Sequence, residues 1–185
     1  MGTVGWIGHT DMFKITRFRD GFIAGVEYYN KVKGKDIQYV SAFTGDWNDP
    51  VKGYETGISM IENYGVDVIY QCDYNGGPGV IKACAEKGVK CIGVDDWQGD
   101  IDSCVFWSAI KSMDVATNTL AKTYQAGTEY GEFYSFNIAG GAKVYDERDE
   151  KNIPADLLAE VQQIIGKIKD GSLDIYEGFD QYRPQ

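Results

Sequence analysis

Short apolar runs alternate with longer amphipathic stretches along the first two thirds of this chain, and that alternation constrains the fold most. The predicted strands are residues 3–8, 37–43, 66–72, 90–94 and 104–107. The predicted helices, in which apolar side chains recur at helical spacing, are residues 13–33, 51–64, 80–87 and 113–126. Strands that alternate with helices form a parallel sheet covered on both faces, because each crossover between parallel strands is right-handed. The sequence therefore predicts an α/β fold, a three-layer Rossmann-like lobe.

The pattern changes after Gly127. Residues 132–138 alternate as a strand does, and we expect residues 143–145 to pair back after a glycine turn. Residues 153–169 carry a single apolar stripe and predict a terminal helix. The two predicted regions are a Rossmann-like lobe, 1–128, and crossover strands with a terminal amphipathic helix, 129–185.

The chain is acidic, with 28 Asp and Glu against 18 Lys and Arg and a formal net charge of −10. Sequence-independent binding to nucleic acid depends on clustered basic side chains that displace counterions from phosphates. We therefore expect no nucleic-acid partner.

Four cysteines and one histidine are the only soft metal ligands in the chain, and none of the cysteines forms a C-x-x-C pair. That set is too sparse for a zinc site, so we predict no metal and no cofactor. The cysteines lie in apolar stretches, which favours buried free thiols over disulfides, although the number permits pairing. They are Cys72, Cys84, Cys91 and Cys104.

No apolar run approaches the 18 residues that a membrane span needs, and the first residues lack the basic and apolar regions of a signal peptide. We expect a soluble chain without a signal peptide. Its first strand begins almost at Met1, as expected of a fragment of a longer protein.

Polar and aromatic residues follow each predicted strand. In an open α/β sheet, ligands bind outside the carboxyl ends of the strands, which here are residues 9–12, 44–49, 73–79, 95–99 and 107–111. Aromatic side chains offer flat apolar faces, and carboxylates accept hydrogen bonds from hydroxyls. The aromatic residues are Trp47, Tyr74, Trp97 and Trp107, and the acids are Asp49, Asp73, Asp95 and Asp96.

Several of these residues have a structural interpretation of equal weight. Asp49 and Asp73 each precede a predicted helix and could cap it. The glycine-rich loop that contains Asn75 and Gly77 either brings backbone N–H groups to a ligand or is a tight turn. No helix follows Asp95 at once, which favours a ligand contact there.

The sequence does not predict an enzyme. His9 is the only histidine, and the chain has no nucleophile elbow or phosphate-loop lysine. A magnesium-dependent enzyme of flavodoxin-like topology would need a nucleophilic aspartate after the first strand, and Asp11 lacks the D-x-D context. We assign no catalytic residue.

An ordered set of motifs resembles one family, the basic membrane protein family of substrate-binding lipoproteins, whose better-known members bind purine nucleosides for ABC import. The matching segments are Val4-Gly5-Trp6-Ile7-Gly8, Phe18-Arg19-Asp20-Gly21-Phe22, Gly45-Asp46-Trp47-Asn48-Asp49-Pro50, Gly65-Val66-Asp67-Val68-Ile69, Gly77-Pro78-Gly79-Val80 and Gly93-Val94-Asp95-Asp96-Trp97-Gln98. Family members have two Rossmann-like lobes of the type I periplasmic-binding-protein fold, with the ligand between them. This chain resembles the part from the second lobe onward.

The resemblance implies that Asp95 hydrogen-bonds ribose hydroxyls, that Lys111 reaches the ligand, and that Tyr74 or Trp47 forms an aromatic wall. It further implies an extracytoplasmic lipoprotein parent, a nucleoside-like ligand and an ABC permease as partner. The alternative is a ligand-sensing regulatory domain of the same fold that does not feed a transporter.

Two segments depart from the family pattern, in which the loop after the third strand is rich in Ala and Gly. Here that loop reads Cys72-Asp73-Tyr74-Asn75, and Trp97 stands where the family has a small or polar residue. Because residues 130–145 would lack a first lobe as neighbour, we also expect a possible homodimer through them.

Overall fold

The computed structural model of the protein describes residues 2–127 and 136–183. Five strands in this part of the chain form one parallel sheet in the order β2-β1-β3-β4-β5. The strands are β1 (Thr3–Gly8), β2 (Gln38–Phe43), β3 (Val68–Cys72), β4 (Lys90–Asp95) and β5 (Val105–Ile110). The predicted α/β class and parallel sheet are confirmed.

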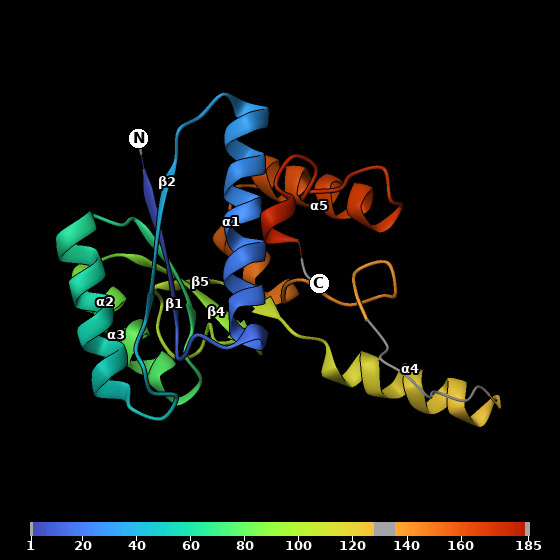
Figure 1. The fold of residues 1–185 in the computed structure, drawn as a ribbon, viewed down its shortest axis with the longest axis horizontal. Coiled ribbons are helices and arrows are strands. Elements are labelled where there is room, and N and C mark those ends of the chain that lie inside the picture. The colour runs from blue at the N-terminus through green and yellow to red at the C-terminus, as the bar shows by residue number, and fades with distance from the viewer. Residues whose placement is uncertain (1, 128–135, 184–185) are drawn as a thin grey trace.

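Helices cover both faces of the sheet, with α1 on one face and α2 and α3 on the other (Figure 1). The helices are α1 (Phe13–Lys33), α2 (Pro50–Tyr64), α3 (Gly77–Lys87), α4 (Met113–Gln125) and α5 (Ala155–Lys169). Three short 3-10 helices, η1 (Tyr74–Gly76), η2 (Glu147–Asn152) and η3 (Asp180–Tyr182), were not predicted.

The larger core lies between the sheet and the α2–α3 pair. Ile7 and Ile69 of the sheet are fully buried against Met60 of α2 and Ile81 of α3. The two helices approach so closely that a Cβ at Gly79 would lie 1.9 Å from the Pro50 carbonyl oxygen. Glycine at this position is therefore what lets α3 pack directly on α2.

The smaller core lies between the sheet and α1. Trp6 is fully buried and meets Phe43 edge to face at 5.5 Å, while Phe18 and Phe22 of α1 pack over Tyr70 and its neighbours. The two cores together fix the strands in register, so the carboxyl ends of β1, β3 and β4 meet at one edge.

The last two helices are attached differently. Helix α4 projects away from the sheet and has no buried residue (Figure 1). Helix α5 also buries no residue completely, but it lies beside α1, where Lys33 and Glu160 form an ion pair at 2.5 Å.

All four cysteines are buried free thiols, as expected. Burial raises the pKa of the Cys72 thiol far above its ordinary value, and burial raises the pKa of Cys104 to about 12. These two thiols are therefore protonated at neutral pH.

Some predicted boundaries move. Strand β5 continues to residue 110 rather than ending at residue 107, because its second half pairs with β4 from Gly93 to Asp95. Helix α3 begins at Gly77 instead of residue 80, since η1 leads directly into it. Helix α5 begins at residue 155 because the backbone of Pro154 is extended (ψ 143°).

The expected strand at residues 132–138 is not found in its described part, and residues 128–135 lie outside the described residues. Residues 136–137 have no regular structure and residues 138–141 form a turn. Tyr145 forms an antiparallel bridge with Ala109 of β5, so the pairing of residues 143–145 is with the sheet edge. The expected homodimer through residues 130–145 stays a prediction, and this bridge shortens the open edge that motivated it.

Across the described residues, no helix combines the length and apolar character that crossing a membrane requires.

Candidate functional site

A cavity of about 400 Å³ opens at the carboxyl edge of the sheet. Its lining comes from the ends of all five strands and from the start of α1. The lining residues are His9, Lys14, Ile15, Phe18, Trp47, Cys72, Tyr74, Val94, Asp95 and Lys111. Four of the six predicted ligand-binding residues, Trp47, Tyr74, Asp95 and Lys111, thus share one cavity.

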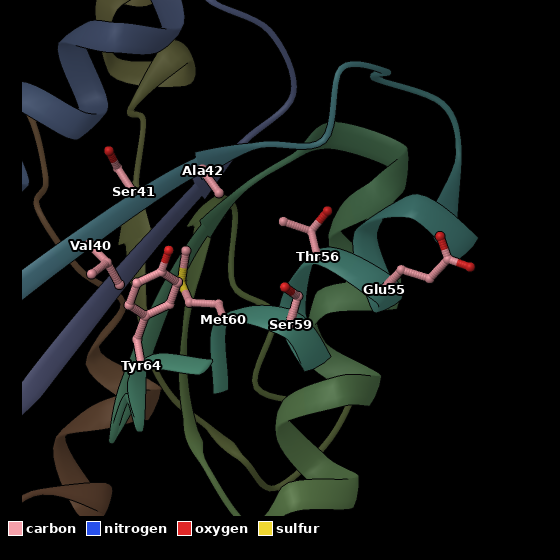
Figure 2. A pocket seen from close by; sticks show the side chains of 8 residues that line it. All are labelled: Val40, Ser41, Ala42, Glu55, Thr56, Ser59, Met60 and Tyr64. Atoms are coloured by element: carbon pink, nitrogen blue, oxygen red, sulfur yellow. The ribbon is translucent and has the colours of Figure 1, made fainter. Parts of the chain in front are cut away.

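A second cavity of about 470 Å³ lies between edge strand β2 and helix α2. Figure 2 shows Tyr64 at one end and Glu55 at the other, with Met60, Thr56 and Ser59 of α2 facing the strand. It lies beside the strand and brings together one carboxylate, three serine or threonine hydroxyls and Tyr64. The cavity at the carboxyl edge combines opposite charges with several aromatic rings, so we take it as the candidate site.

Asp95 and Lys111 form the charged centre of this site. Their side chains are 3.0 Å apart, and each is nearly half exposed. The Lys111 backbone N–H also donates to the Asp95 carbonyl at 3.0 Å, because Lys111 directly follows Ile110, the β5 residue paired with Asp95. An ion pair this exposed adds little stability, so its main effect is to orient the carboxylate.

Asp95 also has an unusual backbone conformation. Its φ of 68° is the only positive φ of a non-glycine residue among the described residues. Aspartate tolerates this left-handed conformation better than most residues, but the conformation still costs free energy and persists only where neighbours hold it.

A buried hydrogen-bond network supports the loops after β3 and β4. The Gln71 amide donates to Gln98 Oε1 at 2.6 Å, and the same oxygen accepts from the Val94 N–H at 3.1 Å. The Gln98 N–H donates to Ser108 Oγ at 3.2 Å, and Gln71 Oε1 accepts from the Asp73 N–H at 3.1 Å. The network therefore ties three strand ends together beneath the cavity.

The two remaining predicted site residues lie outside the cavity lining. Gly77 is buried, and a Cβ there would lie 2.4 Å from Gln71 Oε1, so the absence of a side chain at residue 77 leaves room for the hydrogen-bond network. Asn75 donates to Asn48 Oδ1 at 2.6 Å and joins the loops after β2 and β3. The turn interpretation of this loop fits its geometry better than direct contact with a ligand.

The four aromatic residues at this edge divide into two pairs. Trp47 and Tyr74 are 63% and 67% exposed, with ring centroids 6.4 Å apart, and His9 lies 6.4 Å beyond Trp47. These rings offer open faces to a planar ligand.

Trp97 and Trp107, which were also expected to offer faces at this edge, do not line the cavity. Trp107 stacks on Tyr145 at 4.4 Å, and Arg148 lies over the Trp97 ring at 3.9 Å. Both rings are occupied by a segment that lies far along the chain.

The two acids with a capping interpretation behave differently. Asp49 caps α2, since its Oδ1 accepts from the Val51 and Lys52 N–H groups at 2.9 and 3.3 Å. Asp73 makes no cap hydrogen bond, is fully buried, and neither carboxylate oxygen has a hydrogen-bond partner among the described residues. Burial raises the pKa of Asp73, and the nearby Thr44 hydroxyl and His9 ring offset only part of that effect.

Sequence reasoning missed several lining and supporting residues. Ile15 was not singled out and Phe18 was expected only to pack in the core, yet both line the cavity as well as packing against the smaller core. Gln71, fully buried inside an apolar strand, was the one available signal of the supporting network, because a buried amide requires partners.

Within residues 2–127 and 136–183, no cluster of three or more His, Cys, Asp or Glu side chains could hold a metal ion.

Comparison with known proteins shows which family this sequence and fold resemble. The family model of PnrA-like ABC transporter substrate-binding proteins, Bmp, matches residues 1–175. A "CD4+ T-cell-stimulating antigen" of Listeria innocua is 30% identical over 94% of this chain and 52% of its own length. An "ABC transporter nucleoside-binding protein BmpA" of Lactococcus lactis subsp. cremoris is 30% identical over 75% of this chain and 43% of its own length.

A solved structure of ABC transporter solute-binding proteins from Aeropyrum pernix K1 superposes with a TM-score of 0.79 and 25% identity, covering 94% of this chain and 57% of that one. The chain thus spans about half the length of the curated relatives it matches. With a family model that covers nearly the whole sequence and a matching fold, this chain belongs to the Bmp family of PnrA-like ABC transporter substrate-binding proteins.

Proposed function

We propose that this chain is the second lobe of a solute-binding protein that delivers a purine nucleoside, or a related small polar molecule, to an ABC permease. Family membership supports the binding role, and the nucleoside-binding name of the Lactococcus relative supports the ligand class. A parent of this kind acts outside the cytoplasm as a membrane-anchored lipoprotein.

The observation that carries the ligand assignment is the Asp95–Lys111 pair beside two exposed aromatic rings. A carboxylate held in one orientation accepts hydrogen bonds from two neighbouring hydroxyls, as a ribose offers them, and charge-assisted bonds of this kind are strong. Lys111, 3.0 Å from Asp95, holds the carboxylate in one orientation and can itself donate to the ligand. Trp47 and Tyr74 offer faces on which a purine base stacks.

The proposed ligand needs a second wall. The cavity lies at an edge of the lobe where Trp47 and Tyr74 are mostly exposed, and a good small-molecule site buries roughly 70–90% of its ligand. We infer that a first lobe closes over this edge in the parent and packs along α4. The isolated chain should consequently bind nucleosides weakly.

Calorimetric titration of the two-lobed parent tests this function. We expect inosine or adenosine to bind, 2′,3′-dideoxyinosine to bind much more weakly because Asp95 loses its two donors, and the free base hypoxanthine to bind weakly for the same reason. Equal affinity for inosine and its dideoxy analogue would remove Asp95 from the ribose site. Binding of none of these compounds would remove the nucleoside assignment altogether.

A further inference from the structure

The loop that follows Asp95 is held by a segment more than fifty residues further along the chain. The Trp97 indole N–H donates to Asp149 Oδ1 at 2.8 Å, and the Arg148 guanidinium lies over the same ring at 3.9 Å. A Cβ at Gly99 would lie 2.8 Å from the indole nitrogen, so the loop fits closely around the ring.

Asp149 is placed to hold Trp97 firmly. The residue has no exposed surface, and its second oxygen, Oδ2, has no hydrogen-bond partner among the described residues. The Trp97 indole N–H therefore donates to a carboxyl group that is shielded from water. A hydrogen bond removed from water is electrostatically stronger than an exposed one.

The segment around Asp149 is itself fixed to the sheet. Tyr145 bridges Ala109 and stacks on Trp107, and the Asn152 amide donates to the Phe106 carbonyl at 3.1 Å. Asp149 can thus serve as a fixed point for Trp97, because contacts on both sides of it in sequence hold η2 against β5.

Trp97 and Gln98 are anchored to opposite sides of the loop. The Gln98 side chain points to the buried network beneath the cavity, while the Trp97 ring lies against η2. Asp95, the last residue of β4, lies two residues before Trp97, and its positive φ needs neighbours to hold it. The Trp97 backbone N–H donates to Asp96 Oδ1 at 2.7 Å, so the residue that Asp149 anchors is also linked directly to the turn after Asp95.

We propose that Asp149 is a positioning residue which, through Trp97, holds the Asp95 loop in its ligand-binding conformation. The consequence for ligand binding rests on the proposed function, whereas the consequence for the loop does not. Affinity for a ligand with two hydroxyls then depends on a residue that does not line the cavity.

Amide hydrogen exchange on this chain, without any ligand, tests the effect on the loop. In Trp97→Phe, which keeps a ring and removes the indole N–H, we expect residues 95–98 to exchange about tenfold faster, equivalent to about 1.4 kcal/mol. Amides of β3 serve as the internal reference and should stay within about twofold of their original rates, because local opening does not require opening of the core.

Trp107→Phe is the matched control. Trp107 stacks on Tyr145 of the same segment but lies in β5, outside the loop that follows Asp95. This variant should leave exchange at residues 95–98 unchanged. Asp149→Asn keeps an acceptor oxygen and should retain most of the exchange protection of residues 95–98. Asp149→Leu removes the acceptor and should behave like Trp97→Phe. Unchanged loop exchange in Trp97→Phe, or equal acceleration in Trp107→Phe, would overturn the proposal, and so would acceleration of the loop only in step with β3.

Titration of the two-lobed parent with inosine and 2′,3′-dideoxyinosine adds the link to binding. We expect Trp97→Phe to reduce affinity for inosine several-fold and to leave affinity for the dideoxy analogue unchanged, a selectivity that general loss of stability would not produce. If the unaltered protein binds neither compound, the nucleoside function fails while the exchange result still decides the role of Asp149. If inosine affinity survives a loosened loop, Asp149 does not act on the ligand.

Discussion

Helices α3 and α4 are similar in length and each follows a strand of the same sheet, yet they relate to the lobe in opposite ways. Helix α3 buries Val80, Ile81 and Cys84 against the sheet, and its glycines bring it into backbone contact with α2. Helix α4 buries no residue and projects from the end of β5 (Figure 1). The difference separates the part of the chain that stabilises the lobe from the part that we propose contacts another lobe.

Truncating one apolar side chain in each helix should have the largest effect on this comparison. Ile81→Ala in α3 leaves a cavity in the core, and we expect the free energy of unfolding to fall by about 2–5 kcal/mol. Leu120→Ala in α4 is the matched change at a partly buried position and should cost under about 1 kcal/mol. Urea unfolding of the two variants measures both values, and equal losses would mean that α4 is packed as α3 is.

A glycine substitution tests the close contact between α2 and α3. Gly79→Ala places a methyl group 1.9 Å from the Pro50 carbonyl oxygen, so the helices must separate, at a cost of about 1–3 kcal/mol or more. Gly25→Ala in α1 is the control, because a Cβ there meets nothing within 4 Å, and it should stabilise by about 0.5–1 kcal/mol. Thermal unfolding that ranked Gly79→Ala at or above the unaltered protein would contradict the close packing.

A change at Asp95 moves from stability to binding. Asp95→Asn keeps the shape and tolerates the positive φ, but it removes the charge that accepts two hydroxyls. In the two-lobed parent we expect nucleoside affinity to fall about 10- to 150-fold, which corresponds to about 1.5–3 kcal/mol. Asp100→Asn, the same change at an exposed residue of the neighbouring loop, should leave calorimetric affinity unaltered.

The smallest expected effect concerns pH and the buried acid before α3. Because burial raises the pKa of Asp73 above its ordinary 3.8, ionisation disfavours the folded state, and the stability it contributes in the protonated form is lost as pH rises through its folded pKa. Asp73→Asn should therefore be more stable than the unaltered protein at pH 7, with the difference vanishing below pH 3.8. Urea unfolding at several pH values measures this, and a variant that is less stable at pH 7 would contradict it.

The sequence was sufficient for the sheet and for most helices. In α1, α2 and β1 to β4, the spacing of apolar residues reflects which side chains face the core, so these elements could be predicted from the local sequence alone. Element ends were less predictable, because they depend on pairing across the sheet. The end of β5 is an example, since residues 108–110 are strand only through their pairing with Gly93, Val94 and Asp95.

The convergence of Trp47, Tyr74, Asp95 and Lys111 on one cavity was predictable, because each follows or ends a strand of the sheet. Their contact with a ligand stays a prediction. The site was not predictable where the partner lies far away in sequence. Nothing near Trp97 indicates that its indole meets Asp149, so the ring counted as free for a ligand. The same reason hid the pairing of Tyr145 with β5.

The four buried thiols have a practical consequence. A buried thiol is out of reach of an alkylating reagent, so modification of Cys72, Cys84, Cys91 or Cys104 requires the surrounding core to open first. The rate of alkylation in the native state therefore measures how often each part of the lobe opens, without any introduced label. Because Cys84 lies in α3 and Cys91 in β4, mass analysis of the modified peptides would give separate opening rates for the helix and for the strand.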